Sequence, residues 1–480
     1  MTASTPIRTR MAPSPTGDMH VGSMATLLKN YAFAKKNGGQ FILRIEDTDQ
    51  NRLIEGSEAE LKRVIRDYGL DWDEGPGKDG GHGPYVQSQR LEIYQKKAQE
   101  LINKDLAYYC FCSKERLEQI REGQRAGKKP PRYDRHCLSL SKEEAKERIS
   151  AGEKYVVRLK VPANQEIKFI DLLRGEITVN SDEIDDQVLV KSDGYPTYHL
   201  AVVIDDHLME ISHIMRGEEW ISSTPKRILL YKAFGWQPPI YAHIPIFLNP
   251  SGKGKMSKRK GTVSARLFLD QGYLPEAMLN FFMILGWTPK DQREILTLEE
   301  YINEFDPKDI SAKSVVFDLN KLKWMNGVYI RNLELDELKI RLKPFLPEDF
   351  PTEKLEIILP LIQERLETLA QIEELTDFFY REIELDLDKL LKKANQEIVL
   401  EELSKTQIAL DSLSEWSIES IEKTIRSLQE SGSWKRGQYF MMLRLIMTGR
   451  KVSPPLFETI HALGRDTARD RLANAHQLVA

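Results

Sequence analysis

Cysteine is scarce in this chain, with three among 480 residues. This count excludes the disulfide framework of small secreted domains and is typical of proteins in a reducing compartment. Long apolar runs are also missing, because the longest, residues 279–287, is far shorter than the ~20 residues that cross a bilayer. Residues 1–6 hold no apolar stretch that could serve as a signal peptide. We therefore expect a cytoplasmic protein that has no membrane as a partner.

A large excess of charge of either sign is absent as well. The 69 Lys and Arg residues nearly balance the 73 Asp and Glu residues, for a formal net charge of −4. Any contact with nucleic acid must therefore come from local basic patches. Hydrophobic residues make up 41% of the chain and charged residues 30%, a balance typical of folded globular proteins. A chain of this length exceeds one ordinary core, so we expect roughly two to four domains.

The first hundred residues alternate between strand and helix patterns. Strands are expected at residues 7–11 and 41–45. Between them, apolar residues recur at helical spacing: Met24, Leu27, Leu28 and Tyr31. Ser57 and Glu60 form the pattern of a capping box, which predicts a second helix to about residue 68. This alternation predicts an α/β domain in which helices cover a parallel sheet.

The pattern changes twice farther along the chain. Residues 104–190 contain short strand-like segments and interrupt the α/β pattern, which resumes after them and continues to about residue 250. We interpret this span as an inserted domain. Beyond about residue 325 the periodicity is helical, with one apolar face formed by Ile418, Ile421, Ile425 and Leu428. This last part carries no obvious catalytic cluster, so we assign it to binding or support.

Two short stretches carry the chemistry. The N-terminal motif, residues 10–23, reads RMAPSPTGDMHVGS and lies between an expected strand and an expected helix. Backbone N–H groups and the helix dipole attract phosphate at such a turn, His20 can donate to it, and Gly22 allows close approach. The alternative is an ordinary turn in which His20 only caps the helix.

The basic segment, residues 251–261, reads SGKGKMSKRKG and has five cationic side chains. Such a segment can neutralise the charge that develops as pyrophosphate leaves a triphosphate. It lacks the Walker pattern. The alternative is a solvated basic turn, the more common fate of a run of like charges.

Together these stretches resemble the two signatures of class I aminoacyl-tRNA synthetases. Residues 41–49 (FILRIEDTD) and 214–220 (IMRGEEW) narrow the resemblance to the bacterial glutamyl-tRNA synthetase family, over essentially the whole chain. One departure is Ser23, which stands where the class signature usually ends in a second histidine. The resemblance implies ATP-dependent ligation of L-glutamate to tRNA-Glu through a glutamyl-adenylate, with ATP and Mg²⁺. Whether tRNA-Gln is also a substrate stays open, and nothing demands more than a monomer.

The resemblance also implies an architecture. It consists of a Rossmann-type α/β catalytic domain with an inserted α+β acceptor-end domain, followed by an all-α anticodon-binding region. In residue numbers we expect the catalytic domain at 1–103 and 191–250, the insertion at 104–190, the ATP-site loop and stem-contact region at 251–324, and the helical region at 325–480.

Site residues follow from the same resemblance. His20, Lys255 and Lys258 would be catalytic. The implied ATP-binding residues are Pro13, Ser14, Gly17, His20, Gly22, Ser23, Glu219, Trp220, Lys255, Ser257, Lys258 and Arg259. The implied glutamate-binding residues are Arg10, Ala12, Ser14, Glu46, Tyr195, His199 and Arg216.

Guanidinium groups are the best receptors for carboxylates, and glutamate carries two of them. By the resemblance, Arg10 with Tyr195 would hold the side-chain carboxylate and Arg216 the α-carboxylate, while Glu46 with Ser14 would receive the ammonium group. The amide of glutamine would leave Arg10 without a charge partner.

Three cysteines resemble a zinc module of some family members: Cys110, Cys112 and Cys137. Those members place a histidine where this chain has Ser139, which leaves Tyr133 or His136 as the fourth ligand. Adjacent His136 and Cys137 chelate one ion awkwardly, so we favour a metal-free cluster held by packing and assign no metal ligand. Structural Zn²⁺ is the alternative. The neighbouring basic residues 121–135 suit an RNA end or a solvated loop.

Three other functions remain to be weighed. A non-catalytic tRNA-binding paralogue would lack the lysines of the basic segment, which are present. A shorter relative that glutamylates a modified tRNA base lacks the anticodon-binding third. Glutaminyl-tRNA synthetase differs in the wording of the N-terminal motif and would have a β-barrel anticodon region, whereas the periodicity here is helical.

Overall fold

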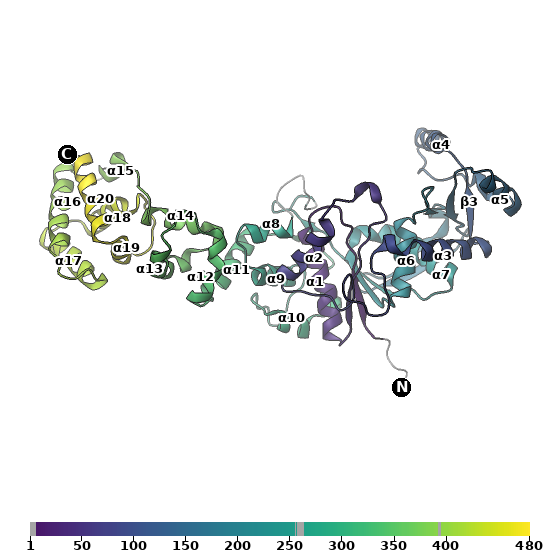
Figure 1. Cartoon of the computed structure of the whole chain (residues 1–480), viewed down its shortest axis with the longest axis horizontal. Coiled ribbons are helices and arrows are strands. Elements are labelled where there is room, and N and C mark those ends of the chain that lie inside the picture. The colour runs from purple at the N-terminus through teal and green to yellow at the C-terminus, as the bar shows by residue number, and fades with distance from the viewer. Residues whose placement is uncertain (1–5, 255, 257–263, 392–394) are drawn as a thin grey trace. The chain divides into compact units, whose positions relative to one another are not determined.

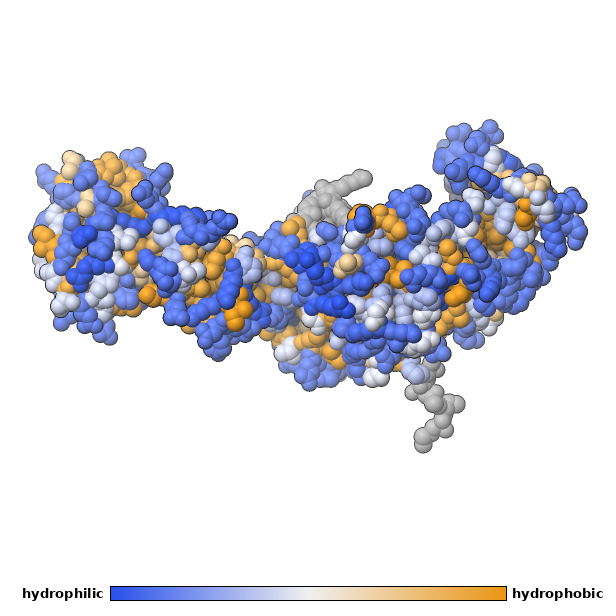
Figure 2. Space-filling model, viewed as in Figure 1, coloured by the Kyte–Doolittle hydropathy of each residue, from blue (hydrophilic) through white to orange (hydrophobic). Residues whose placement is uncertain are grey.

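A computed structural model describes residues 6–254, 256, 264–391 and 395–480. The chain divides into two compact units. The first consists of Met1–Phe268 and Met278–Leu319, and the second of Leu269–Ala277 and Asn320–Ala480. Hydrophilic residues dominate the face drawn in Figure 2, in line with the high share of charged side chains.

Parallel strands form the centre of the first unit, as expected. β1 (Arg8–Met11) pairs in parallel with β2 (Gln40–Leu43), and α1 (Val21–Lys36) connects them. β8 (His213–Gly217) pairs in parallel with β9 (Ile240–Ile244). The two pairs adjoin, because the backbone N–H of Ser212 donates to the carbonyl of Arg8 at 2.9 Å. The core-facing residues of these strands are buried, as a parallel sheet under helices requires.

Part of the expected insertion belongs to this sheet. The hairpin of β5 (Glu166–Asp171) and β6 (Gly175–Asn180) extends it, since Asp171 of β5 pairs in parallel with Tyr241 of β9. The rest of the span builds a separate antiparallel sheet of β3 (Ala107–Cys110), β4 (Val156–Leu159) and β7 (Val188–Val190). Two helices accompany that sheet (Figure 1): α4 (Lys114–Ala126) and α5 (Lys142–Ser150).

Seven further α-helices and β-strands lie wholly within the described part of the first unit. They are α2 (Ser57–Asp67), α3 (Leu91–Asn103), α6 (Tyr198–Leu208), α7 (Thr224–Phe234), β10 (Phe247–Leu248), α10 (Leu298–Glu304) and β11 (Val315–Val316). Three helices contain residues of both units: α8 (Ala265–Asp270), α9 (Pro275–Ile284) and α11 (Leu319–Arg331).

The predicted helix after residue 57 is present, but the predicted capping box is wrong. The N-cap of α2 is Gly56, and Ser57 is already the first helical residue. The Ser57 hydroxyl bonds the backbone of Gly17 instead, with its Oγ 3.1 Å from the Gly17 nitrogen. A side chain that matches a capping pattern is therefore used here to hold the N-terminal motif.

The described part of the second unit is helical, as predicted. Its helices after α11 are α12 (Leu335–Leu342), α13 (Leu355–Ile362), α14 (Ile372–Thr376), α15 (Leu387–Leu391), α16 (Gln396–Asp411), α17 (Ile418–Ser431), α18 (Arg436–Thr448), α19 (Leu456–Leu463) and α20 (Arg465–Val479). Ile421 and Ile425 of α17 are fully buried in one continuous apolar core, whereas Ile418 at the helix start is 37% exposed. No helix among the described residues of either unit is long and apolar enough to cross a membrane.

Replacement of Ile425 by alanine tests that core. Ile425→Ala removes buried methyl groups and leaves a cavity, so we expect the free energy of unfolding of this unit to fall by about 2–5 kcal/mol. Ile408→Ala is the matched control, because Ile408 is 70% exposed on α16 and its loss should change stability by less than about 0.5 kcal/mol. Denaturant unfolding followed by circular dichroism measures both, and equal effects would contradict the packing described.

Candidate active site

The flanks of the basic segment meet the N-terminal motif. Before the segment, Phe247 of β10 lies 3.6 Å from the position that a Cβ on Gly22 would occupy. After it, Ser264 pairs with His20, and the Ala265 N–H donates to the Met19 carbonyl at 2.8 Å. The two stretches therefore converge at these flanks, as expected. The predicted site residues Lys255, Ser257, Lys258 and Arg259 lie outside the described residues.

His20 is the N-cap of α1 and also has a defined tautomer. Its Nδ1 accepts a hydrogen bond from the Gly22 N–H at 2.9 Å, so a neutral ring carries its proton on Nε2. The first turn of α1 has no acidic residue, which leaves the positive end of the helix dipole uncompensated by carboxylates there. His20 thus serves as the cap of α1, and its neutral ring carries the proton on Nε2.

The loop before His20 is held by distant backbone groups. Glu46 N–H donates to the Pro13 carbonyl at 3.0 Å, and Ile54 N–H donates to the Pro15 carbonyl at 3.1 Å. Gly17 has a φ of 120°, a region that only glycine adopts readily, which explains its place in the turn. Ser14 is exposed, Ala12 is half-buried at the end of β1, and Ser23 N–H donates to the His20 carbonyl. The dipoles of this loop are therefore fixed before any ligand arrives.

A buried ion network underlies the loop. Arg44 Nη1 lies 2.8 Å from Asp206 Oδ1 and Arg44 Nη2 lies 3.0 Å from Glu46 Oε1. Arg10 Nε approaches the same Asp206 oxygen at 3.2 Å. Burial raises the pKa of Glu46, with Arg44 and Arg10 acting against that rise. Burial also opposes ionisation of Asp206, but Arg10 and Arg44 hold the pKa of this carboxyl below its usual value.

The sequence analysis did not identify Arg44 and Asp206, two charged residues that are nearly inaccessible to solvent in the folded chain. Arg44 stands two residues before the predicted Glu46 in a segment whose sequence is typical of a buried strand, and Asp206 is about 160 residues away in α6. Burial of a charged residue is the signal that finds such groups, and it exists only in the folded chain.

Arg216 is oriented by a chain of three hydrogen bonds. Its Nε donates to His243 Nε2 at 3.0 Å, and its Nη2 donates to the Thr224 hydroxyl at 2.7 Å. His243 Nδ1 in turn donates to Asp171 Oδ2 at 2.6 Å, which assigns the tautomer of the ring. Nη1 of Arg216 is buried and has no hydrogen-bond partner among the described residues. This one nitrogen can therefore receive a carboxylate oxygen.

The structure distinguishes two nearby tyrosines. Tyr195 lies in the turn that follows β7, and its ring packs 5.4 Å from the Lys191 ammonium group. Tyr198 starts α6 and shares the electrostatic environment of the ion network, because burial and Glu46 raise the pKa of its hydroxyl while Arg227 and Arg10 act against that rise. Tyr198, which the sequence analysis did not name, is therefore a further candidate for the site that holds Arg10 and Glu46.

His199 and Trp220 lie close to Tyr198. The rings of Tyr198 and Trp220 are 4.9 Å apart, and those of Tyr198 and His199 are 5.6 Å apart. Burial and the neighbouring Arg227 lower the pKa of His199 to about 3, so its ring is neutral at physiological pH. Glu219 is exposed, and its carboxylate fills the space beside Gly217 that a Cβ would occupy.

Comparison with known proteins decides the family. The model of the tRNA synthetases class I (E and Q) catalytic domain matches residues 6–324, about two thirds of the chain. The chain belongs to this family. An anticodon binding domain model matches residues 337–476 of the same synthetase chain, the part predicted to be a helical anticodon-binding region.

Relatives along the whole length agree with the family. A glutamate–tRNA ligase of Dehalococcoides mccartyi (strain CBDB1) is 44% identical over 480 residues, which cover 98% of this chain and 97% of the relative. A glutamate–tRNA ligase of Finegoldia magna is also 44% identical, over 98% of this chain and 99% of its own. The crystal structure of a glutamate tRNA ligase from Elizabethkingia meningosepticum, in complex with its amino acid, superposes with a TM-score of 0.90 at 35% identity, covering 99% of this synthetase and all of that chain.

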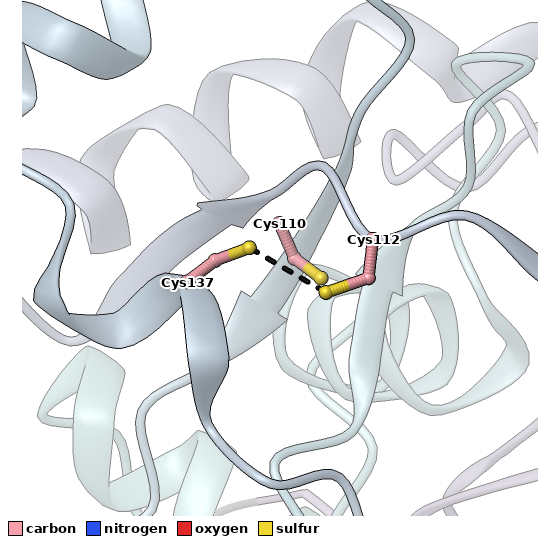
Figure 3. A group of neighbouring side chains, drawn as sticks. All are labelled: Cys110, Cys112 and Cys137. Carbon is pink, nitrogen blue, oxygen red and sulfur yellow. Dashed lines mark hydrogen bonds between the residues drawn. The ribbon is translucent and has the colours of Figure 1, made fainter. Parts of the chain in front are cut away.

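A second cluster lies in the antiparallel sheet of the synthetase. The sulfur atoms of Cys110, Cys112 and Cys137 lie within 4.8 Å of one another and face a common point (Figure 3). The Tyr133 hydroxyl is 3.3 Å from Cys110 Sγ and 3.4 Å from Cys112 Sγ. His136, the other candidate for a fourth ligand, is exposed. The cluster therefore consists of three thiols and one phenol.

Two guanidinium groups surround this cluster. Arg158 lies 4.0 Å from the centre of the Tyr133 ring, and Arg116 Nη1 lies 3.4 Å from Cys112 Sγ. Three thiolates and a phenolate would carry four negative charges, of which a divalent cation offsets two. Arg158 would offset part of the remainder, whereas Arg116 is already paired with Asp134 through both of its terminal nitrogens.

Proposed function

We propose that the chain is a glutamate–tRNA ligase, which joins L-glutamate to the 3′ end of tRNA-Glu at the expense of ATP through a glutamyl-adenylate. Near-complete coverage of relatives with that name, at 44% identity, is the observation that carries the proposal. The buried arginines Arg10 and Arg216 support the choice of an acidic amino acid. The direct experiment is aminoacylation with glutamate. It uses purified tRNA-Glu and tRNA-Gln side by side, because contacts with the nucleic acid decide whether the enzyme has one or two tRNA substrates.

Two arginines and one acid would hold the amino acid. Arg216 offers Nη1 to one carboxylate, and Arg10 uses Nε for Asp206, which leaves its two terminal nitrogens for the other. Glu46 would receive the ammonium group, with Ser14. Tyr198, whose hydroxyl shares the electrostatic environment of Arg10, would complete the surroundings of the substrate with Tyr195, Ala12 and His199.

The α-carboxylate of glutamate would attack the α-phosphorus of ATP directly, so the protein needs no nucleophile of its own. Catalysis then consists of alignment and charge neutralisation. The N-terminus of α1 with His20 would hold phosphate oxygens, and Lys255 and Lys258 would neutralise the leaving pyrophosphate. Glu219 and Trp220 would lie beside the adenosine. Mg²⁺ would be bound chiefly by phosphate oxygens, because no cage of three acidic groups occurs among the described residues of this site.

The remaining parts of the chain would bind tRNA. The antiparallel sheet with α4 and the basic residues 121–135 would contact the acceptor end, and the helices from about residue 325 onward would read the anticodon. We infer that the protein is cytoplasmic and monomeric. Size-exclusion chromatography with light scattering would test the monomeric state.

The cysteine cluster is a second proposal. Cys110, Cys112, Cys137 and Tyr133 would hold one structural Zn²⁺, which would tie β3 to the loop before α5. The convergence of four ligand atoms carries this proposal, since tetrahedral zinc takes four ligands. It replaces our expectation of a metal-free cluster, because the Tyr133 hydroxyl lies against two of the three sulfur atoms, whereas the sequence left the fourth ligand open between Tyr133 and His136.

Substitution of His20 and Lys258 tests the adenylate step. We expect His20→Ala and Lys258→Ala to lower glutamate-dependent pyrophosphate exchange by about 100-fold or more, while calorimetric binding of glutamate changes little. His20→Asn keeps a cap acceptor for Gly22, so it separates loss of the imidazole from loss of the cap. Lys253→Ala removes an exposed cation from the same segment and should have little effect. Unchanged single-turnover chemistry in both main variants would refute the role.

Substitution of Asp171 tests the orientation of Arg216. Asp171→Asn can donate to His243 Nδ1, which would move the ring proton to Nε2 and set it against the Arg216 N–H. We expect KM for glutamate to rise about tenfold, with KM for ATP nearly unchanged. Asp105→Asn, at an exposed ion pair with Lys160, is the control. Equal kinetics in the two variants would remove Arg216 from the substrate site.

Metal analysis tests the cysteine cluster. Chain purified without chelator should contain about one zinc per molecule, and Cys112→Ser should abolish most of it. Tyr133→Phe should weaken zinc retention during dialysis, whereas His136→Ala should retain zinc like the parent. Parent protein free of zinc after expression with added metal would contradict the proposal.

A further inference from the structure

Arg227 is a buried cation to which neither the candidate active site nor the proposed function assigns a role. It lies in α7, is 1% exposed, and none of its three guanidinium nitrogens has a hydrogen-bond partner among the described residues. Its neighbours are aromatic: the guanidinium carbon is 5.0 Å from the centre of the Tyr198 ring and 5.1 Å from that of Trp220. A buried guanidinium without an anion is unfavourable, so an anionic partner that is not part of the chain would stabilise it.

Other buried charges joined to the amino-acid site balance one another. Four arginines (Arg10, Arg44, Arg90 and Arg216) are linked, directly or through His243, to four carboxylates (Glu46, Asp171, Asp205 and Asp206). His199 adds no charge, because its pKa is lowered to about 3 by burial and by Arg227. Arg227, which packs against Tyr198, is therefore a positive charge that none of these four carboxylates pairs with among the described residues.

Free glutamate carries a net charge of −1, whereas glutamine carries none. The positive charge of Arg227 and the net charge of glutamate cancel when the amino acid is bound. The low polarity of a buried site increases the free-energy difference between binding glutamate and binding glutamine. Tyr198 connects Arg227 with the amino-acid site. Its ring packs against Arg227, and the pKa of its hydroxyl is raised by Glu46 and lowered by Arg10.

We propose that Arg227 is a specificity-determining residue of the amino-acid site, whose unpaired guanidinium supplies the positive charge that the side-chain carboxylate of glutamate balances and that the amide of glutamine leaves unbalanced. Arg227 acts through the field at the site and through the position of Tyr198 and Trp220. The inference rests on the proposed glutamate–tRNA ligase function.

Arg227→Gln removes the charge and keeps a polar side chain of similar reach. We expect KM for glutamate in pyrophosphate exchange to rise about 10- to 100-fold, with KM for ATP within about twofold of the parent, and the ratio of kcat/KM for glutamate over glutamine to fall by about tenfold or more. Arg227→Lys should restore most of that ratio, because it restores the charge. Lys226→Gln removes the adjacent, half-buried cation of α7, where solvent screens the charge, and should leave the ratio unchanged.

Thermal melting separates this role from a structural one. An arginine that stabilises the fold would lower Tm when replaced, whereas an uncompensated charge should leave Tm of Arg227→Gln without glutamate equal to or above that of the parent. Saturating glutamate should then raise Tm of the parent more than that of the variant. A lower Tm for Arg227→Gln without glutamate, or an unchanged ratio of glutamate to glutamine, overturns the inference. A parent enzyme that activates no glutamate overturns the proposed function instead.

Discussion

Buried ion pairs centred on Arg44 link three parts of the chain that are distant in sequence. Arg44 is completely buried after β2, and it binds Glu46 two residues away and Asp206 in α6, which also holds Arg10 of β1. Loss of one partner would strand buried charges, at a cost of about 3–5 kcal/mol. The strands, α6 and the amino-acid site therefore depend on one ion network, and the site cannot rearrange without breaking the core beneath it.

This dependence suits a reaction that needs alignment more than chemistry from the protein. The loop before α1 is tied to Glu46 and Ser57, and Arg216 is held by His243, Thr224 and Asp171. Groups fixed in this way pay no reorganisation cost when substrate charge develops. Most buried polar groups of the site thus orient one another, whereas Nη1 of Arg216 and the three guanidinium nitrogens of Arg227 have no hydrogen-bond partner among the described residues.

Local pattern predicted elements well and side-chain partners poorly. The strands near residues 7 and 41, the helix between them and the helical last third are present, because periodicity reports which face is buried. Ser57 matched a capping box but holds Gly17, since tertiary contact outweighed the local pattern. The hairpin at residues 166–180 was assigned to the insertion, yet Asp171 pairs with Tyr241 some seventy residues later. Strand neighbours of that separation leave no mark in local periodicity.

The sequence by itself determined the family and the reaction, and it predicted the two stretches of the ATP site, because these depend on residue types at short spacing along the chain. Only the tertiary structure decided that Tyr133 rather than His136 faces the three cysteines, and that Arg227 has no hydrogen-bond partner among the described residues. Each of these outcomes depends on burial and on contacts between segments far apart in the chain, which exist only once the chain has folded.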